Sequence, residues 1–330
     1  MVSIIMPARN AGPFLTACLD SILNQTYEDW ELIVVDDKSS DDTWSIIEQY
    51  SLRDSRIKGL KNIGEGIIAA LQTGYKVSNG QFITRMDADD FMAPNKLQLM
   101  TTALSCKEEA VVATGKVSYF SNEPLGPGFK KYEDWLNTQI DHNKQFSEIY
   151  KECVVPSPCW MIGRPAFEDC GGFESETYPE DYDLCFRFYQ KGYTIVGIDT
   201  ILHYWRDHPG RASRTSEHYA ENSFLQLKTN YFIKIDYNPK QPLLLWGAGK
   251  KGKKLAEIFQ NAGIIYIWAC NNPSKIGHVI HGQTMNSIDE ILENQTEITQ
   301  AIIAVANPQD QDEIKNLLND NTLLKPYWFC

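Results

Sequence analysis

Two groups of acidic residues have the types and spacing needed for chemistry. Asp87, Asp89 and Asp90 form a D-x-D-D pattern, and Glu180 and Asp181 form a separate acidic pair. Carboxylates crowded together raise one another's pKa and destabilise the fold unless a cation lies between them. Hard Mg²⁺ or Mn²⁺ takes oxygen ligands and leaves part of its coordination shell to water and substrate phosphates. The first group therefore predicts a divalent-metal site that serves a phosphorylated substrate.

A structural role stays open for both groups. Aspartates that follow a strand are commonly solvated turn residues or helix N-caps, and a D-x-D pattern by itself is short. Acidic residues are also favoured at the start of a helix by its macrodipole, which fits Glu180 and Asp181 at the head of an apolar helical pattern. The position of each group in the fold has to decide between these interpretations.

The first hundred residues predict the elements that position these side chains. Short apolar runs rich in β-branched residues alternate with amphipathic stretches, which is typical of βαβ units and a mainly parallel sheet. The predicted strands are 2–6, 31–35, 57–60 and 81–86, and a helix is predicted over 65–77. Asp36 and Asp37 follow the second strand, and Asp87 follows the fourth. Open α/β sheets bind ligands at the carboxyl ends of their strands, so we expect both clusters at one edge.

The rest of the chain predicts further elements and a second domain. The expected elements are a strand at 110–120, a loop at 121–128, a helix beginning at Glu180, and two strands at 194–198 and 201–205. A helical pattern over 224–235 leads into a linker marked by proline at 236–242. A new βαβ pattern starts at Leu243. We therefore expect one domain at residues 1–237 and another at 238–330.

Charge and composition exclude several classes of protein. The 330 residues are 43% hydrophobic and 22% charged, which excludes collagen, coiled coil and bulk disorder. Lys and Arg number 31 against 43 Asp and Glu, and the net charge of −12 repels phosphate backbones. We therefore expect no nucleic acid partner. An acidic protein that binds an anionic substrate needs a divalent cation or locally placed positive charge.

Cysteine usage and hydropathy predict a cytoplasmic protein. The eight cysteines include no C-x-x-C pair and no zinc-type spacing, as expected of reduced thiols. No basic leader precedes the apolar start at residues 2–6, and the longest uncharged run, 258–274, is interrupted by Gln, Asn, Gly and Pro. We expect no transmembrane segment, and peripheral membrane association stays open.

Several segments together resemble glycosyltransferase family 2, whose catalytic domain has the GT-A fold. The segments are Val2-Ser3-Ile4-Ile5-Met6-Pro7-Ala8-Arg9-Asn10, Val34-Val35-Asp36-Asp37-Lys38-Ser39-Ser40-Asp41-Asp42-Thr43 and Met86-Asp87-Ala88-Asp89-Asp90. They occur in the family's order within residues 1–235. The resemblance implies a GT-A sheet sandwiched by helices, an enzyme that uses a nucleotide sugar, and Mn²⁺ or Mg²⁺ as cofactor.

The resemblance also implies roles for residues in the first three segments. Asp37, with Asp36 beside it, would contact the nucleotide base, and Pro7, Ala8 and Arg9 would line the same pocket. Asp87 would approach the ribose. Asp89 would bind the metal ion that bridges the two phosphates. The opening loop departs from the family, in which an aromatic or aliphatic residue and Tyr more often precede Asn10.

Two later segments complete the resemblance. Gly171-Gly172-Phe173 followed by Glu180-Asp181 matches the motif whose aspartate is the catalytic base, which makes Asp181 the base and Glu180 a donor contact. The segment 204–213 is similar to the loop that closes over the diphosphate. Within it, Arg206 and Arg211 would contact the diphosphate and His208 would be a further metal ligand. Surface roles for these three side chains stay open.

Two features that the sequence lacks, and one region with aromatic residues, bear on how the acceptor is used. No Gln-x-x-Arg-Trp motif of processive synthases follows Asp181, and no membrane span is expected, so we predict addition of a single sugar. Acceptor specificity is expected within 106–165, where Tyr132, Trp135, Cys159 and Trp160 would stack on a sugar or belong to the core.

The C-terminal part contains a glycine pattern of its own. Gly247, Gly249 and Gly252 form G-x-G-x-x-G between a predicted strand and helix, where backbone N–H groups could hold a phosphate. Asn271-Asn272 occupies the place of the acidic residue that would bind a ribose. This part resembles small Rossmann-like modules found beside sugar-modifying domains, so a packing or regulatory role is expected.

Three hypotheses about function follow. The first is a metal-dependent, inverting glycosyltransferase that moves one hexosyl or N-acetylhexosaminyl group from a nucleotide sugar, by preference a UDP-sugar, to a glycan or lipid-linked acceptor in polysaccharide or surface glycan synthesis. The second is a dinucleotide-binding oxidoreductase centred on the C-terminal domain. The third is a sensor that binds nucleotide sugar without turnover.

Overall fold

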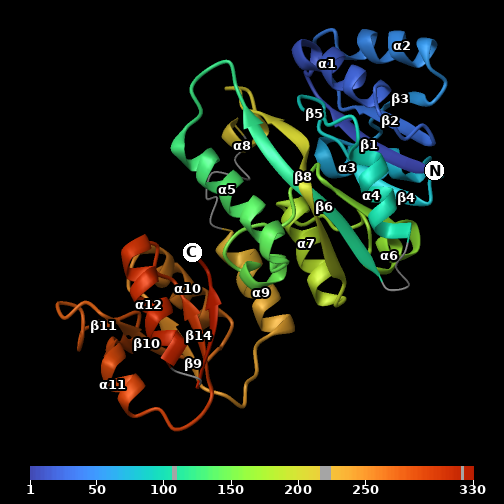
Figure 1. Ribbon diagram of the computed structural model, residues 1–330. Coiled ribbons are helices and arrows are strands. Elements are labelled where there is room, and N and C mark those ends of the chain that lie inside the picture. Colours follow the sequence, from blue (N-terminus) through green and yellow to red (C-terminus); the bar gives the residue numbers. More distant parts are fainter. Residues whose placement is uncertain (106–109, 216–223, 321–322) are drawn as a thin grey trace. The chain divides into compact units, whose positions relative to one another are not determined.

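The computed structural model describes residues 1–105, 110–215, 224–320 and 323–330, and the chain divides into two compact units (Figure 1). The first unit comprises Met1–Ser147 and Cys153–Ala220. The second comprises Glu148–Glu152 and Glu221–Cys330. The boundary predicted at residue 238 falls inside the second unit, and its assignment as a domain boundary stays a prediction.

The first unit is built on a mixed sheet, which has eight strands in the described part of the chain. Their spatial order is β3 (Ile57–Lys61), β2 (Trp30–Asp36), β1 (Val2–Ala8), β4 (Phe82–Arg85), β7 (Trp160–Gly163), β6 (Val111–Phe120), β8 (Thr194–Arg206) and β5 (Phe91–Met92). The strands β3, β2, β1 and β4 run parallel, as their alternation with helices predicts. This confirms a mainly parallel α/β sheet.

Helices cover both faces of this sheet. The helices of the first unit are α1 (Gly12–Leu23), α2 (Thr43–Arg53), α3 (Gly66–Lys76), α4 (Lys96–Ser105), α5 (Pro127–His142), α6 (Arg164–Asp169), α7 (Glu180–Gln190) and α8 (Ala212–Thr215), and a 3₁₀ turn spans Gln145–Glu148. On one face, side chains of α1, α2, α4 and α5 share a core with β1, β2 and β6. On the other, Gly74 of α3 lies so close to Ile5 and Val35 that a Cβ would be 2.9 Å and 3.1 Å from their side chains.

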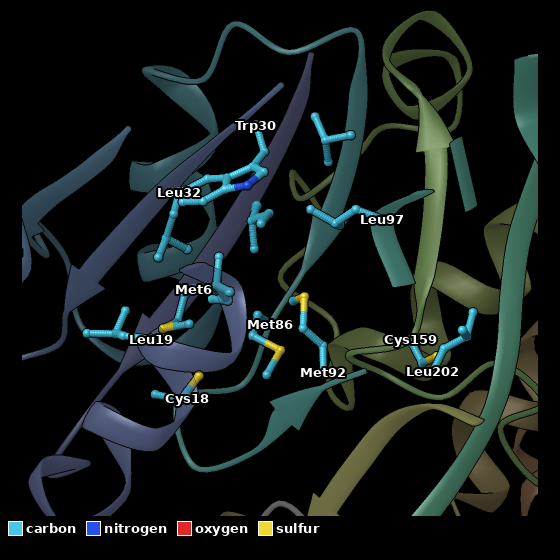
Figure 2. Close-up of a cluster of buried hydrophobic side chains, with 14 of the residues drawn as sticks. Met6, Cys18, Leu19, Trp30, Leu32, Met86, Met92, Leu97, Cys159 and Leu202 are labelled. Atoms are coloured by element: carbon cyan, nitrogen blue, oxygen red, sulfur yellow. The ribbon is translucent and has the colours of Figure 1, made fainter. Parts of the chain in front are cut away.

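The core of the first face is shown in Figure 2. Leu19 and Cys18 of α1 point toward Met6 of β1, and Leu97 of α4 lies in the same cluster. These side chains are fully buried, and Trp30 at the start of β2 is almost so. Burying side chains on both faces explains why β1 and β2 are mostly apolar, with uninterrupted apolar runs at Ile4–Met6 and Leu32–Val35.

The late part of the sheet differs from the sequence prediction. Residues 194–198 and 201–205 belong to one strand, β8, and not to two. Its pairing with β6 jumps from Gly115–Ile198 to Lys116–Ile201, which marks a bulge. A bulge adds residues without ending a strand. The polar pair Asp199-Thr200 therefore looked like a turn in the sequence.

The second unit has its own sheet, in which five parallel strands are described. Their order is β13 (Asn286–Ser287), β10 (Ile267–Cys270), β9 (Leu243–Trp246), β14 (Thr299–Ile303) and β15 (Leu324–Trp328). The other elements are α9 (Leu225–Ile235), α10 (Lys250–Asn261), α11 (Ile288–Glu293), α12 (Pro308–Asp320) and the hairpin β11 (Val279–Ile280) and β12 (Gln283–Thr284). Trp246, Ala269 and Ile303 are fully buried in its core.

The helices were also compared with the length and hydropathy that crossing a bilayer requires. Within the described ranges, none is both long and apolar enough to span a membrane.

Candidate active site

The carboxyl ends of β1 and β2 form the first part of the site. The backbone N–H of Asp37 donates to the carbonyl of Ala8 at 2.8 Å, and Ala8 pairs with Asp36. Pro7 lies one residue earlier in β1. Asp36 is buried at the end of β2, where Lys61 donates to its Oδ2 at 2.9 Å. The residues of the two strands that were predicted to bind the nucleotide are thus neighbours.

The carboxylate of Asp37 is held by groups from three segments. The N–H of Gly66, at the start of α3, lies 3.0 Å from Oδ2, and the Asn62 amide donates to Oδ1 at 2.7 Å. The guanidinium of Arg9 lies 3.6 Å from Oδ2. Asp37 is almost fully buried while Arg9 is largely exposed. The exposed guanidinium of Arg9 therefore lies next to the carboxylate of Asp37, which its hydrogen bonds hold in place.

The second part of the site is a buried arginine between two acidic groups. Arg85 ends β4, and its Nε donates to Oδ1 of Asp87 at 2.9 Å. Its Nη1 donates to Oε1 of Glu180 at 2.8 Å, and 95 positions separate these residues in the chain. The D-x-D-D segment and the Glu180-Asp181 pair, which the sequence places far apart, therefore meet at Arg85.

The environment of Asp181 suits a proton acceptor. Asp181 lies in the first turn of α7, and the N–H of Tyr182 donates to its Oδ1 at 2.8 Å. Burial, with the charge of Glu180, raises the pKa of Asp181 to about 7, although the charge of Arg85 acts to lower it. A carboxylate with a pKa near 7 can both take and release a proton at neutral pH.

The glycines that precede this helix have structural roles. Gly171 and Gly172 have φ of +82° and +46°, a region that favours glycine. A Cβ on Gly172 would lie 2.9 Å from the Phe167 ring. The Arg187 guanidinium of α7 donates to the carbonyls of Cys170 and Gly172 at 2.8 Å. The Gly-Gly-Phe turn is thereby tied to the helix that carries Asp181.

The third part of the site joins Asp89 to the end of β8. Nε2 of His208 lies 2.9 Å from Oδ2 of Asp89, and Nε of Arg206 donates to the Asp89 carbonyl at 2.7 Å. Burial acts to raise the pKa of Asp89, but the hydrogen bond with His208 and the charge of Arg211 lower it overall. Asp89 is therefore an ionised carboxylate beside an imidazole nitrogen.

Arg211 lies among the same carboxylates. Burial opposes its charge, but Tyr119 and the carboxylates of Asp90 and Asp89 raise the pKa of its guanidinium. The guanidinium also lies 5.3 Å from the ring centroid of Trp205. The sequence required local positive charge in an acidic protein, and Arg206 and Arg211 supply it at this edge.

Behind Asp89, a buried polar chain connects three elements. Oδ2 of Asp90 lies 2.9 Å from Nε2 of His203, and Nζ of Lys96 lies 3.4 Å from Nδ1 of the same ring. Oδ1 of Asp90 accepts the backbone N–H of Arg206 at 2.7 Å. Burial, with the charges of Asp89 and Asp87, raises the pKa of Asp90, and burial lowers that of His203. Asp90 thus fastens β8 to the acidic segment.

The residues fit a divalent ion with few protein ligands. Within the described ranges, no group of three or more His, Cys, Asp or Glu side chains is arranged to hold a metal. Asp89 and His208 offer one carboxylate and one imidazole, and Mg²⁺ or Mn²⁺ commonly takes its other ligands from water and substrate phosphates. The pair is compatible with an ion that binds together with a diphosphate.

The four residues considered for the acceptor separate into two groups. Cys159 and Trp160 are buried, and Trp160 stacks on Phe167 at 5.8 Å, so both belong to the core. Tyr132 and Trp135 of α5 are partly buried and stack on each other at 5.7 Å. An acceptor contact by the second pair stays a prediction.

Gly247 and Gly249 of the glycine pattern in the second unit precede α10, and Gly252 lies in the first turn of that helix. Gly247 has φ of +133°, and a Cβ on Gly252 would lie 2.1 Å from the Gly247 carbonyl oxygen. A Cβ on Gly249 would meet nothing within 4 Å. Oδ1 of Asn271 accepts a hydrogen bond from Trp246 Nε1 at 2.7 Å. Two of the glycines are thus explained by close packing of the backbone, and phosphate binding by this loop stays a prediction.

The sequence interpretation missed Arg85 and Asn62. A signal for Arg85 existed, since it is a charged residue at the end of an apolar strand and two positions before Asp87. Its partner Glu180 could not be identified from spacing. Asn62 follows β3 directly, a position equivalent to that of Asp37 after β2, and only the fold shows that the two side chains meet.

Comparisons with known proteins show which family this chain resembles. A family model described as glycosyl transferase family 2 matches residues 3–171. The uncharacterized glycosyltransferase EpsJ of Bacillus subtilis is 36% identical over 249 residues, which cover 72% of this chain and 69% of EpsJ. A second relative, from Escherichia coli, is 43% identical over 105 residues, which cover 32% of this chain and 41% of the relative. It is named UDP-Glc:alpha-D-GlcNAc-diphosphoundecaprenol beta-1,3-glucosyltransferase WfgD.

Solved structures share the fold. The crystal structure of S. aureus TarS 1–349 in complex with UDP-GlcNAc superposes with a TM-score of 0.53 at 18% identity. The match covers 78% of this chain and 71% of that one.

Proposed function

The chain belongs to glycosyltransferase family 2, and from this premise we propose an inverting, metal-dependent enzyme that transfers one sugar from a UDP-sugar to a hydroxyl group. It is a glycosyltransferase with the GT-A fold. Membership of this family supports a nucleotide-sugar donor and a role in glycan synthesis. We propose, beyond that membership, the inversion of configuration, the use of a metal ion and the identity of the donor.

The placement of Asp181 carries the proposal. Its neighbour Glu180 shares Arg85 with Asp87, so Asp181 stands at the same edge of the sheet as the acidic D-x-D-D segment. Its pKa is raised to about 7, chiefly by burial. Asp181 and Asp89 are separate carboxylates, and an inverting transfer requires a base that does not also bind the leaving group.

In the proposed reaction Asp181 takes the proton of the acceptor hydroxyl. The acceptor oxygen attacks the anomeric carbon from the face opposite the diphosphate, and the bond to the diphosphate breaks with its electron pair on the phosphate oxygen. Configuration at the anomeric carbon is therefore inverted. Arg206, which donates to the Asp89 carbonyl, and Arg211, which lies near the carboxylates of Asp89 and Asp90, would hold the negative charge of the departing diphosphate.

Asp89 and His208 are the residues that would hold Mn²⁺ or Mg²⁺. Such an ion, when bound, supplies Lewis-acid stabilisation of the diphosphate. The remaining contribution of the chain is to keep the two side chains together, which Asp90 does by fastening β8 to the acidic segment.

The donor and acceptor are proposed by analogy. The E. coli relative is named for UDP-Glc and an acceptor linked to diphosphoundecaprenol, and TarS was crystallised with UDP-GlcNAc. We propose a UDP-linked hexose or N-acetylhexosamine as donor and a glycan or lipid-linked saccharide as acceptor. Asp37, with Arg9 over it, is the proposed contact for the base, alongside Pro7, Ala8 and Asp36. Asp87 is the proposed ribose contact.

The second unit is proposed to be Rossmann-like, with a packing or regulatory role. Its strand order, β13-β10-β9-β14-β15, is that of the first five strands of the dinucleotide-binding fold. Asn271 stands near where an acidic residue would bind a ribose, and it is engaged by Trp246. No specific observation therefore favours an oxidoreductase.

A two-step experiment tests the proposed function. A thermal-shift panel of UDP-, GDP- and dTDP-sugars, each with and without Mn²⁺, identifies base, sugar and metal dependence together. Release of nucleoside diphosphate is then measured for the wild type and for Asp181→Asn with the donor that binds. We expect a loss of at least about 10²-fold in the variant. Wild-type rates in Asp181→Asn would refute the assignment of the base.

A further inference from the structure

We infer that Arg85 is a positioning residue that joins the donor-binding segment to the catalytic carboxylate, an inference that rests on the proposed function. Arg85 is the last residue of β4 and is 5% exposed. Asp87 lies two residues further along the chain, and Glu180 begins α7. The guanidinium is therefore the point at which the sheet, the acidic segment and the catalytic helix meet.

The contacts of Arg85 use both sides of its guanidinium. Nε and Nη2 each lie 2.9 Å from Oδ1 of Asp87, and Nη1 lies 2.8 Å from Oε1 of Glu180. A guanidinium is planar and presents its donors in a rigid fork. One arginine therefore sets the separation of two carboxylates that belong to different elements, which a lysine with a single charged nitrogen would not do.

Glu180 depends on this contact for its position. Its Oε2 is buried and makes no hydrogen bond to any residue in the described ranges. A buried carboxylate that has lost its partner is strongly unfavourable. Removing the guanidinium would therefore release Glu180, and with it the first turn of α7, where Asp181 lies.

The charge of Arg85 also acts on Asp181. Among the described residues, the titratable or charged groups that act on Asp181 are Glu180 on its own helix, Arg85 and Asp87 at the end of β4, and the buried thiol of Cys153. Arg85 is the cation among them. Its loss would leave Asp181 with acidic neighbours and would favour the protonated form of the base.

The test compares Arg85→Met and Arg85→Lys with Arg164→Met in the complete chain. Arg164 is a matched control because its partly buried guanidinium donates to Gly80 and Ser78, in the segment that leads into β4, and these partners lie outside the acidic segments. The readout is release of UDP from UDP-glucose and UDP-N-acetylglucosamine by hydrolysis in the presence of Mn²⁺, measured as kcat and kcat/KM between pH 5 and 9. This readout needs no acceptor.

We expect the two Arg85 variants to differ in a way that separates charge from geometry. In Arg85→Met the acidic limb of the kcat/KM profile moves upward by about 1 to 3 pH units, because the cation is lost. In Arg85→Lys the acidic limb of the kcat/KM profile stays near its wild-type position, because the positive charge is kept. The value of kcat falls about 10²-fold, because the forked guanidinium is lost and Asp181 is displaced. In Arg164→Met the limb does not move.

Several other outcomes would overturn the inference. If Arg85→Met keeps the wild-type limb and rate, Arg85 does not position the base. If Arg85→Met does not fold, Arg85→Lys decides, and a wild-type kcat in that variant rejects the role of the fork. A limb that moves equally in Arg164→Met would mean that any loss of stability shifts it. A wild type that no UDP-sugar stabilises in the thermal-shift panel and that releases no UDP refutes the proposed function itself, and the inference with it.

Discussion

Nε2 of His208 lies 2.9 Å from Oδ2 of Asp89, although 119 positions separate the two residues in the chain. The pair joins the turn after β4 to the segment after β8. The ring of His208 also packs on Phe14 of α1, with centroids 4.5 Å apart. The imidazole is therefore held by two elements in a position from which it can share a cation with Asp89.

Replacing His208 should weaken the metal dependence of nucleotide binding. In His208→Ala we expect the gain in UDP affinity on adding Mn²⁺ to fall by about 10- to 100-fold, since even changes in the residues that support metal ligands have effects of that size. Isothermal titration calorimetry of UDP binding with and without Mn²⁺ measures this gain in affinity. His142→Ala is the control, because His142 is exposed in the last turn of α5. Equal metal dependence in both variants would exclude His208 as a ligand.

Stability should depend on pH through Asp181. Its pKa is about 7 in the folded protein and near 3.8 otherwise, so the folded state binds the proton more tightly. The resulting destabilisation is absent below about pH 4, grows as the pH rises, and is complete above about pH 7. Asp181→Asn removes it. We expect the difference in Tm between the variant and the wild type to grow in the variant's favour from pH 4 to pH 8, measured without added metal. A difference that is flat across this range would contradict the raised pKa.

Asp37 should matter for both nucleotide affinity and stability. Asp37→Ala leaves the Gly66 N–H without its acceptor and the Asn62 amide with only the Gly66 carbonyl, and a buried polar group that loses its partner typically costs about 1 to 3 kcal/mol. We expect weaker UDP binding in titration calorimetry and a lower free energy of unfolding in urea. Asp29→Ala serves as control, because Asp29 precedes β2 at the opposite end and is 66% exposed. Unchanged UDP affinity in Asp37→Ala would remove this residue from the proposed base contact.

The glycines of the second unit should differ sharply in their tolerance of alanine. A Cβ on Gly252 would lie 2.1 Å from the Gly247 carbonyl oxygen, and such overpacking typically costs about 1 to 3 kcal/mol. A Cβ on Gly249 has open space around it, and φ there is −80°. We expect Gly252→Ala to lower the unfolding temperature of this unit and Gly249→Ala to leave it within the error of calorimetry. Equal effects would mean that the loop has another conformation.

Local pattern predicted much of the fold. The strand at 57–60 was found as Ile57–Lys61, and the helix at 65–77 as Gly66–Lys76. Alternation of apolar runs with helical spacing is a property of neighbouring residues, so it can be read without knowing the fold. The helix α5 was missed, and β8 was taken as two strands, because its bulge places polar residues inside one strand.

The acidic residues of the site were also identifiable from the sequence, since aspartates after apolar strands and before an apolar helix stand out by type and position. The sequence could not show which of them share a partner. Arg85 lies between Asp87 and Glu180 because a parallel strand ends, and a helix distant in the sequence begins, at the same edge of the sheet. Hydrogen bonds join atoms that are close in space, and closeness between residues 85 and 180 arises only when the chain has folded. Residue types thus determined which chemistry the side chains of this protein offer, and packing of the helices on the sheet decided which of those side chains lie together.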